Sequence, residues 1–106
     1  MAIRLSKRGD IIMLIKGDKV KFVGEKQRYT VRACNYRFAI CTKPFNLKRT
    51  VIYTIVDFKE WIRGTENLIF GAGAETDPQC RRMLRRLTKG ETKISHRNNI
   101  PLHIDE

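Results

Sequence analysis

The sequence predicts a mainly β fold with one helix, an α+β arrangement. In it, a small SH3-like antiparallel barrel or meander is followed by a C-terminal amphipathic helix. About five short stretches of β-forming residues, separated by turn-forming residues, follow one another between residues 17 and 70. After residue 74 the apolar residues change to helical spacing. The chain has 106 residues, enough for one compact core but not for two.

The expected domain comprises residues 13–106, and residues 1–12 are expected to form a flexible basic N-terminal extension. The first clear strand is residues 19–23. Its alternation places Val20 and Phe22 inward, with lysines on the outer face.

Residues 29–42 predict a hairpin, because apolar and polar residues alternate on both sides of Asn35-Tyr36. If these two residues form the turn, Ala33 lies opposite Phe38. A longer loop is the alternative, because tyrosine tolerates a positive φ poorly. In the two-residue register every large apolar side chain falls on one face, made by Tyr29, Val31, Ala33, Phe38 and Ile40. The other face carries Arg32 and Arg37.

The later strands are less regular. Residues 51–58 are apolar on both faces, which predicts a central strand or one whose second face is covered by the helix. Residues 64–67 are expected to form a turn and residues 68–70 a short strand. Residues 94–97 predict a last edge strand, followed by a turn at Asn98-Asn99 and an irregular end.

The helix has clear start and stop signals. Thr76 or Asp77 can cap it, Pro78 suits its first turn, and Gln79 stands three residues after Thr76. Gly90 is the expected stop. The apolar face consists of Cys80, Met83, Leu84 and Leu87.

The net charge of +11 predicts affinity for a polyanion, either nucleic acid or an acidic protein. The opposite helix face concentrates this charge in Arg81, Arg82, Arg85, Arg86 and Lys89. The like-charge pairs four residues apart cost about 1 kcal/mol together at low salt, and arginine suits bidentate phosphate contacts. The alternative is that acidic residues elsewhere pair with these cations across the fold. The candidates for that role are Asp57, Glu60, Glu66 and Glu75.

A second basic set lies on the strands and their connections: Arg32, Arg37, Lys43, Lys48 and Arg49. Tyr36 and Phe45 are interleaved with it, and cations beside exposed aromatic rings are typical of platforms that bind single-stranded nucleic acid. In the alternative interpretation Phe45 packs into the core and the cations are simply solvated.

Several other kinds of site find little support. Cys34, Cys41 and Cys80 contain no CxxC pair and share no zinc-finger spacing with the histidines, so reduced cysteines and no metal are expected. The glycines before the helix lack the third glycine of a dinucleotide fingerprint. No acid–base or nucleophile pair is identifiable. We therefore expect no cofactor and no enzyme activity.

No apolar run approaches the roughly 18–20 residues that a membrane span needs, and no signal peptide is recognisable, which predicts a cytoplasmic protein without membrane contact.

Several blocks resemble a widespread family of small proteins of tailed bacteriophages and prophages that has no established activity. They are GDKVKF (17–22), YTVRA (29–33), RFAICTKPFN (37–46), TVIYTIVDF (50–58) and NLIFG (67–71), and residues 76–87 and 95–102 also fit. The resemblance covers about residues 16–102. It implies a phage-encoded accessory protein that acts in the cytoplasm of the bacterial host.

These observations predict a non-enzymatic accessory protein that contacts nucleic-acid phosphates through the basic helix face. The alternative is a protein-interaction module that binds and modulates a host defence or transcription protein. A virion or assembly component is a third possibility.

Overall fold

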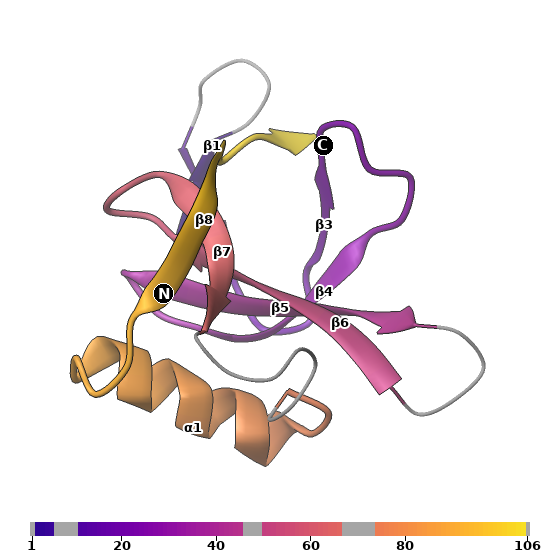
Figure 1. Cartoon of the computed structure of the whole chain (residues 1–106). Coiled ribbons are helices and arrows are strands. Elements are labelled where there is room, and N and C mark those ends of the chain that lie inside the picture. Colours follow the sequence, from indigo (N-terminus) through magenta and orange to yellow (C-terminus); the bar gives the residue numbers. More distant parts are fainter. Residues whose placement is uncertain (1, 6–10, 46–49, 67–73, 106) are drawn as a thin grey trace.

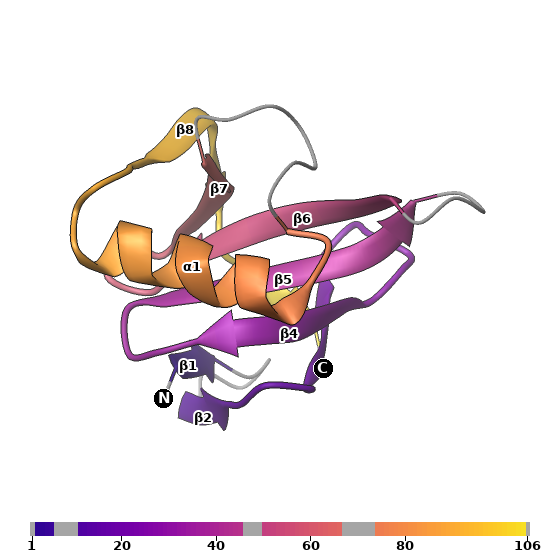
Figure 2. The same ribbon diagram turned by 90° about the horizontal axis from the view of Figure 1, so that it is seen from below.

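A strongly curled antiparallel sheet forms most of the molecule, and a helix packs against one of its faces (Figures 1 and 2). The structure is a computed structural model that describes residues 2–5, 11–45, 50–66 and 74–105. The strand order in the sheet is β8 (Ile94–Pro101), β7 (Ile62–Glu66), β6 (Thr50–Asp57), β5 (Phe38–Phe45), β4 (Tyr29–Cys34), β3 (Lys19–Phe22) and β9 (Ile104–Asp105). The helix, α1 (Asp77–Thr88), lies between β7 and β8 in the sequence.

The predicted fold class, mainly antiparallel β with one helix in a small barrel-like arrangement, is confirmed for the described residues. The helix does not end the domain, because β8 and β9 follow it. Strand β8 lies at the edge of the sheet, as predicted, but it continues through Pro101. The predicted turn at Asn98-Asn99 is therefore wrong.

The N-terminal segment contains a hairpin. Strand β1 (Ala2–Leu5) pairs with β2 (Ile11–Leu14) in a separate two-stranded sheet. Leu14 at the end of β2 is completely buried and belongs to the main core. The predicted division between residues 1–12 and 13–106 stays a prediction.

The core has two parts, one on each face of the curled sheet. The inner cluster lies inside the curl and consists of Leu14, Val20, Phe22, Tyr29, Val31, Ala39, Cys41, Val56, Phe58, Leu102 and Ile104. The outer cluster lies between the sheet and α1 and consists of Ala33, Phe38, Ile40, Tyr53, Ile55, Ala74, Cys80, Met83 and Leu87. Strands β5 and β6 contribute to both clusters. The predicted burial of both faces of residues 51–58 is thereby confirmed, with α1 covering the second face.

The hairpin of β4 and β5 has a different register from the predicted one. Ala33 lies opposite Ile40, and the backbone N–H of Asn35 donates to the carbonyl oxygen of Phe38 over 2.9 Å. The turn residues are thus Tyr36 and Arg37. The Oδ1 atom of Asn35 accepts from the N–H groups of Arg37 and Phe38, both over 2.8 Å, and this side-chain turn fixes the tip.

A β-bulge at Arg32 explains why the predicted single apolar face is also wrong. The register shifts by one residue between Val31, which pairs with Cys41, and Ala33, which pairs with Ile40. As a result Val31 points into the inner cluster and Ala33 into the outer one. The bulge directs apolar residues of the hairpin to both layers of the core.

A tight turn joins β6 to β7. The Oδ1 atom of Asp57 accepts from the N–H groups of Lys59 and Glu60 over 2.9 and 3.2 Å, and Trp61 adopts a φ of 59°. The following residues, including Gly64, then form a strand, so the turn predicted at residues 64–67 is wrong where the structure describes it. The strand predicted at residues 68–70 lies outside the described residues.

Candidate nucleic-acid interface

The start of α1 is fixed by the capping box that the sequence predicts. Thr76 is the N-cap, and its Oγ1 atom accepts from the backbone N–H of Gln79 over 3.3 Å. The Gln79 Oε1 atom accepts from the backbone N–H of Thr76 over 2.9 Å. Pro78 occupies the first turn, where a missing N–H costs nothing. Local signals in the sequence therefore mark where the helix begins.

The end of α1 is fixed at Gly90, as predicted. Gly90 has a φ of 77°, which favours glycine, and its N–H donates to the carbonyl of Leu87 over 3.2 Å. The N–H of Glu91 donates to the carbonyl of Arg86 over 2.9 Å. These two bonds make a Schellman motif. Both ends of the helix are thus held independently of any ligand.

The predicted apolar face of α1 packs onto the sheet: Cys80, Met83 and Leu87 are buried, and Leu84 is half-buried against the outer cluster. The opposite face presents four exposed cations to solvent: Arg81, Arg82, Arg85 and Lys89. We call these four residues the helix cations. Within the described part of the chain, no acidic side chain pairs with any of them.

Arg86, the fifth predicted helix cation, is half-buried and has a partner within the fold. Of the acidic residues considered as internal partners, Asp57 pairs with Arg37 instead, over 3.4 Å. The side chain of Glu66 lies outside the described residues.

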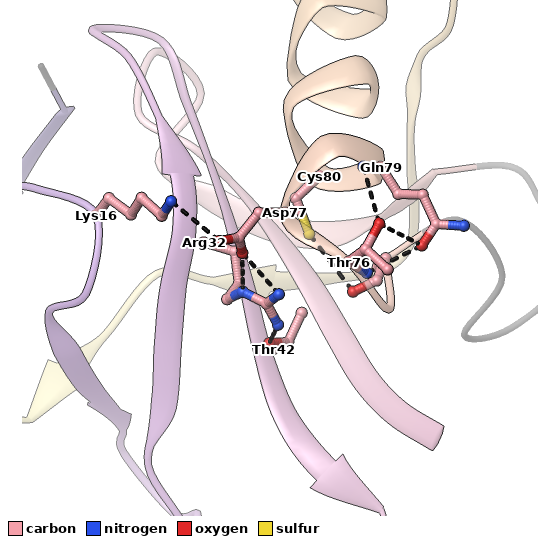
Figure 3. Close-up of polar contacts among 8 residues, drawn as sticks. Lys16, Arg32, Thr42, Thr76, Asp77, Gln79 and Cys80 are labelled. Carbon is pink, nitrogen blue, oxygen red and sulfur yellow. Dashed lines mark hydrogen bonds and ion pairs between the residues drawn. The ribbon is translucent and has the colours of Figure 1, made fainter. Parts of the chain in front are cut away.

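Arg32 belongs to an ion-pair network at the start of α1 (Figure 3). Its Nε and one terminal nitrogen both lie 2.7 Å from Oδ1 of Asp77, and the other terminal nitrogen donates to Thr42 over 3.2 Å. Lys16 reaches Oδ2 of the same carboxylate over 3.0 Å. Hydrogen bonds from Lys16 and then Arg32 lower the pKa of Asp77 below its ordinary value of 3.8. Arg32 therefore connects β4 to the first turn of α1.

Arg37 lies at the other end of α1. Its guanidinium stacks 4.9 Å from the centre of the Phe38 ring and pairs with the buried carboxylate of Asp57. The Nδ2 atom of Asn35 donates to Oγ1 of Thr88 over 2.8 Å, which joins the hairpin tip to the end of the helix. Of the described cations in the second basic set, Arg37 is the one placed beside the helix cations.

An open groove of about 750 Å³ separates the end of α1 from the β6–β7 turn and the start of β8. Its apolar lining is Phe38, Ile62, Leu87 and Ile94. Its charged lining is Arg37, Lys89, Lys93, Asp57 and Glu60. The groove is thus continuous with the helix cations through Lys89, and no motif in the sequence predicts it.

Lys43 lies on the opposite face of the sheet, away from the helix cations. Its Nζ atom lies 4.9 Å from the centre of the Tyr29 ring and 4.0 Å from Oε2 of Glu25. Arg63, which the sequence did not single out, shares this cluster: it pairs with Oε1 of Glu25 over 3.0 Å and stacks 3.8 Å from the Phe22 ring. Lys48, Arg49 and the side chain of Phe45 lie outside the described residues.

The three cysteines are free thiols, as predicted. Cys41 is completely buried in the inner cluster, and this burial raises the pKa of its thiol to about 12. Cys80 is also buried, and its thiol donates to the carbonyl of Ala74. Among the described residues, no group of three or more histidine, cysteine or carboxylate side chains is placed to share a metal ion.

Within the residues that the structure describes, α1 is too short and too polar to cross a membrane. Comparisons of the chain with protein-family models, with curated protein sequences and with solved structures return no match.

Proposed function

We propose that this chain is a small accessory protein of a tailed bacteriophage that binds nucleic-acid phosphates through the helix cations, in the cytoplasm of the bacterial host and without catalysing a reaction. One observation carries the proposal: Arg81, Arg82, Arg85 and Lys89 are exposed on one helix face, and no described acidic side chain neutralises them. A protein that needed this face only for solubility would gain as much from mixed charges, which also avoid the repulsion between neighbouring cations.

The spacing of the helix cations suits a phosphate backbone. Arg81 and Lys89 are eight residues apart in the sequence, so they are separated by about 12 Å along the helix axis. This length lets the cations contact several successive phosphates of one strand. Arginine guanidinium groups can bind phosphate oxygens in pairs.

The rigidity of α1 supports the same function. The capping box, the Schellman motif and the buried face hold the helix before any ligand arrives. The cations therefore lose little backbone freedom on binding, which lowers the entropic cost of association.

The proposal is tested by reversing two helix cations, Arg82→Glu together with Arg85→Glu. Glu at position 85 places an acid four residues from both Arg81 and Lys89, so the helix gains two favourable pairs and should remain folded. We expect binding to a fluorescent oligonucleotide, measured by anisotropy at low salt, to weaken by more than ~10-fold.

The matched control is Lys26→Glu together with Arg28→Glu. Both residues are exposed in the β3–β4 connection, far from α1 in Figure 1, and the double change alters the net charge equally. We expect it to weaken binding much less. Equal weakening by both double variants would mean that only the total charge matters, and unchanged binding in the helix variant would contradict the proposal.

The second candidate function, binding to an acidic host protein, is favoured by the apolar lining of the groove beside the cations, since protein interfaces combine apolar centres with charged rims. A pull-down from phage-infected cells, with and without nuclease, separates the two functions. Nucleic-acid binding predicts that captured material disappears after nuclease treatment, whereas a host-protein module predicts a protein partner that remains.

A further inference from the structure

The groove at the end of α1 has features that a phosphate-binding helix alone does not need. Its accessible apolar lining comes from Ile62 and Ile94, which are half-buried, whereas Phe38 and Leu87 belong to the buried outer cluster. Its volume of about 750 Å³ lies within the range of about 300–1,000 Å³ typical of small-molecule sites. A site that recognised only phosphates would require donors and cations but no apolar wall.

An exposed aromatic residue occupies the hairpin turn that borders this groove. The side chain of Tyr36 is 71% exposed, and Tyr36 directly precedes Arg37, which lines the groove. The hairpin tip that carries Tyr36 is held by hydrogen bonds from the Arg37 and Phe38 N–H groups to Asn35, and by the bond from Asn35 to Thr88. The turn that carries Tyr36 is therefore fixed beside the end of the helix.

The two sides of the groove differ in charge. Arg37 is paired with Asp57, and Glu60 contributes one more acid on the side of the β6–β7 turn. Lys89 and Lys93 lie on the helix side and form no ion pair with the described acidic residues. Anionic groups are therefore favoured along the helix side of the groove, and uncharged flat groups along its apolar wall.

We propose that the ligand of this surface is single-stranded nucleic acid, with phosphates on the helix cations and Lys93, and with bases in the groove and on the ring of Tyr36. This inference rests on the proposed function and specifies its substrate. A duplex keeps its bases stacked and paired, so it cannot place them in a groove beside the backbone contacts. A single strand exposes its bases, and stacking on aromatic side chains is the usual way in which small domains hold them.

The experiment compares four probes by fluorescence anisotropy: a thymine oligonucleotide of ~12 nucleotides, an abasic strand and an RNA strand of the same length, and a DNA duplex of ~12 base pairs, which carries more phosphates than any of the single strands. We expect the two base-carrying single strands to bind at least ~10-fold more tightly than the abasic strand and the duplex. Tyr36→Ala should remove about tenfold of affinity for the thymine strand and leave abasic binding unchanged, whereas Tyr36→Phe should retain the affinity.

The outcomes separate this inference from the proposed function. If all four probes bind equally and only Arg82→Glu/Arg85→Glu weakens them, phosphate binding holds but the base site is wrong. If the duplex binds more tightly than the single strands, the inference is likewise overturned. If no probe binds, both proposals fail. Circular dichroism of the Tyr36 variants checks their fold, which should not change because the ring is exposed.

Discussion

At the scale of single residues, Asp77 connects three parts of the chain. One carboxylate joins Lys16 from the N-terminal segment and Arg32 from β4 to the first turn of α1. Its negative charge also lies at the positive end of the helix dipole. The charged form of Asp77 is thus favoured in the folded state, which is why its pKa is lowered.

Replacing Asp77 by Asn should lower stability at neutral pH and remove part of the acid sensitivity. Because the folded-state pKa lies below the unfolded one, the contribution of Asp77 is present above about pH 4 and disappears as the pH falls through the folded value. In urea unfolding, the difference between wild type and Asp77→Asn should therefore shrink below about pH 4. Glu91→Gln, at an exposed acid without a described ion pair, is the control, and an identical effect there would refute the assignment.

Cys41 should not react with alkylating reagents in the folded protein. Its thiol is completely buried, and with a pKa of about 12 only about one molecule in ten thousand carries the reactive thiolate at pH 8. Iodoacetamide at pH 8 should leave Cys41 unmodified until denaturant is added, as peptide mass spectrometry would show. Rapid modification without denaturant would mean that the inner cluster opens readily.

At the scale of elements, α1 depends on its cap. Thr76→Ala removes the acceptor for the Gln79 N–H, and we expect a loss of about 0.5–2 kcal/mol in the free energy of unfolding. Thr76→Ser keeps the hydroxyl and should lose much less. Equal losses for both variants, measured by chemical denaturation, would show that the methyl group of Thr76 matters rather than the cap.

The helix was predictable from the sequence because its signals are local. Its cap, apolar face and stop all lie within fifteen residues, from Thr76 to Gly90. The turns of the β4–β5 and β6–β7 hairpins could not be predicted in the same way, because each is set by a side-chain acceptor. Asn35 accepts in the first turn and Asp57 in the second. The positive φ of Trp61 and the bulge at Arg32 violate simple alternation, so strand β7 and the two-sided burial of the β4–β5 hairpin were not predicted.

In the candidate site, too, local features were predictable from the sequence and long-range contacts were not. Helical spacing alone places the helix cations on one exposed face, as predicted. It could not reveal that Arg32 reaches Asp77, 45 residues away. Helical spacing also could not show that Lys93 and Arg37 line the same groove, because this groove forms only when β5, β6 and α1 pack together.

At the scale of the whole molecule, the distribution of charge matters more than its total. The chain has 22 lysines and arginines against 11 acidic residues. Several of these acids are used inside the fold: Asp57 pairs with Arg37, Asp77 with Arg32, and Glu25 with Arg63. Such pairing joins elements that are distant in the sequence. It also leaves the outer face of α1 as a surface of one sign, which would concentrate anionic ligands near it.

The central claim is that the helix cations neutralise phosphates, and the salt dependence of binding tests it most directly. Each neutralised phosphate of a single strand adds about 0.7 to the slope of log affinity against log salt concentration. Contacts from the four helix cations thus predict a slope of magnitude about 3 for the wild type. Arg82→Glu/Arg85→Glu should reduce it by about 1.5 or more. A slope near zero in the wild type, or the same slope in the variant, would contradict the account.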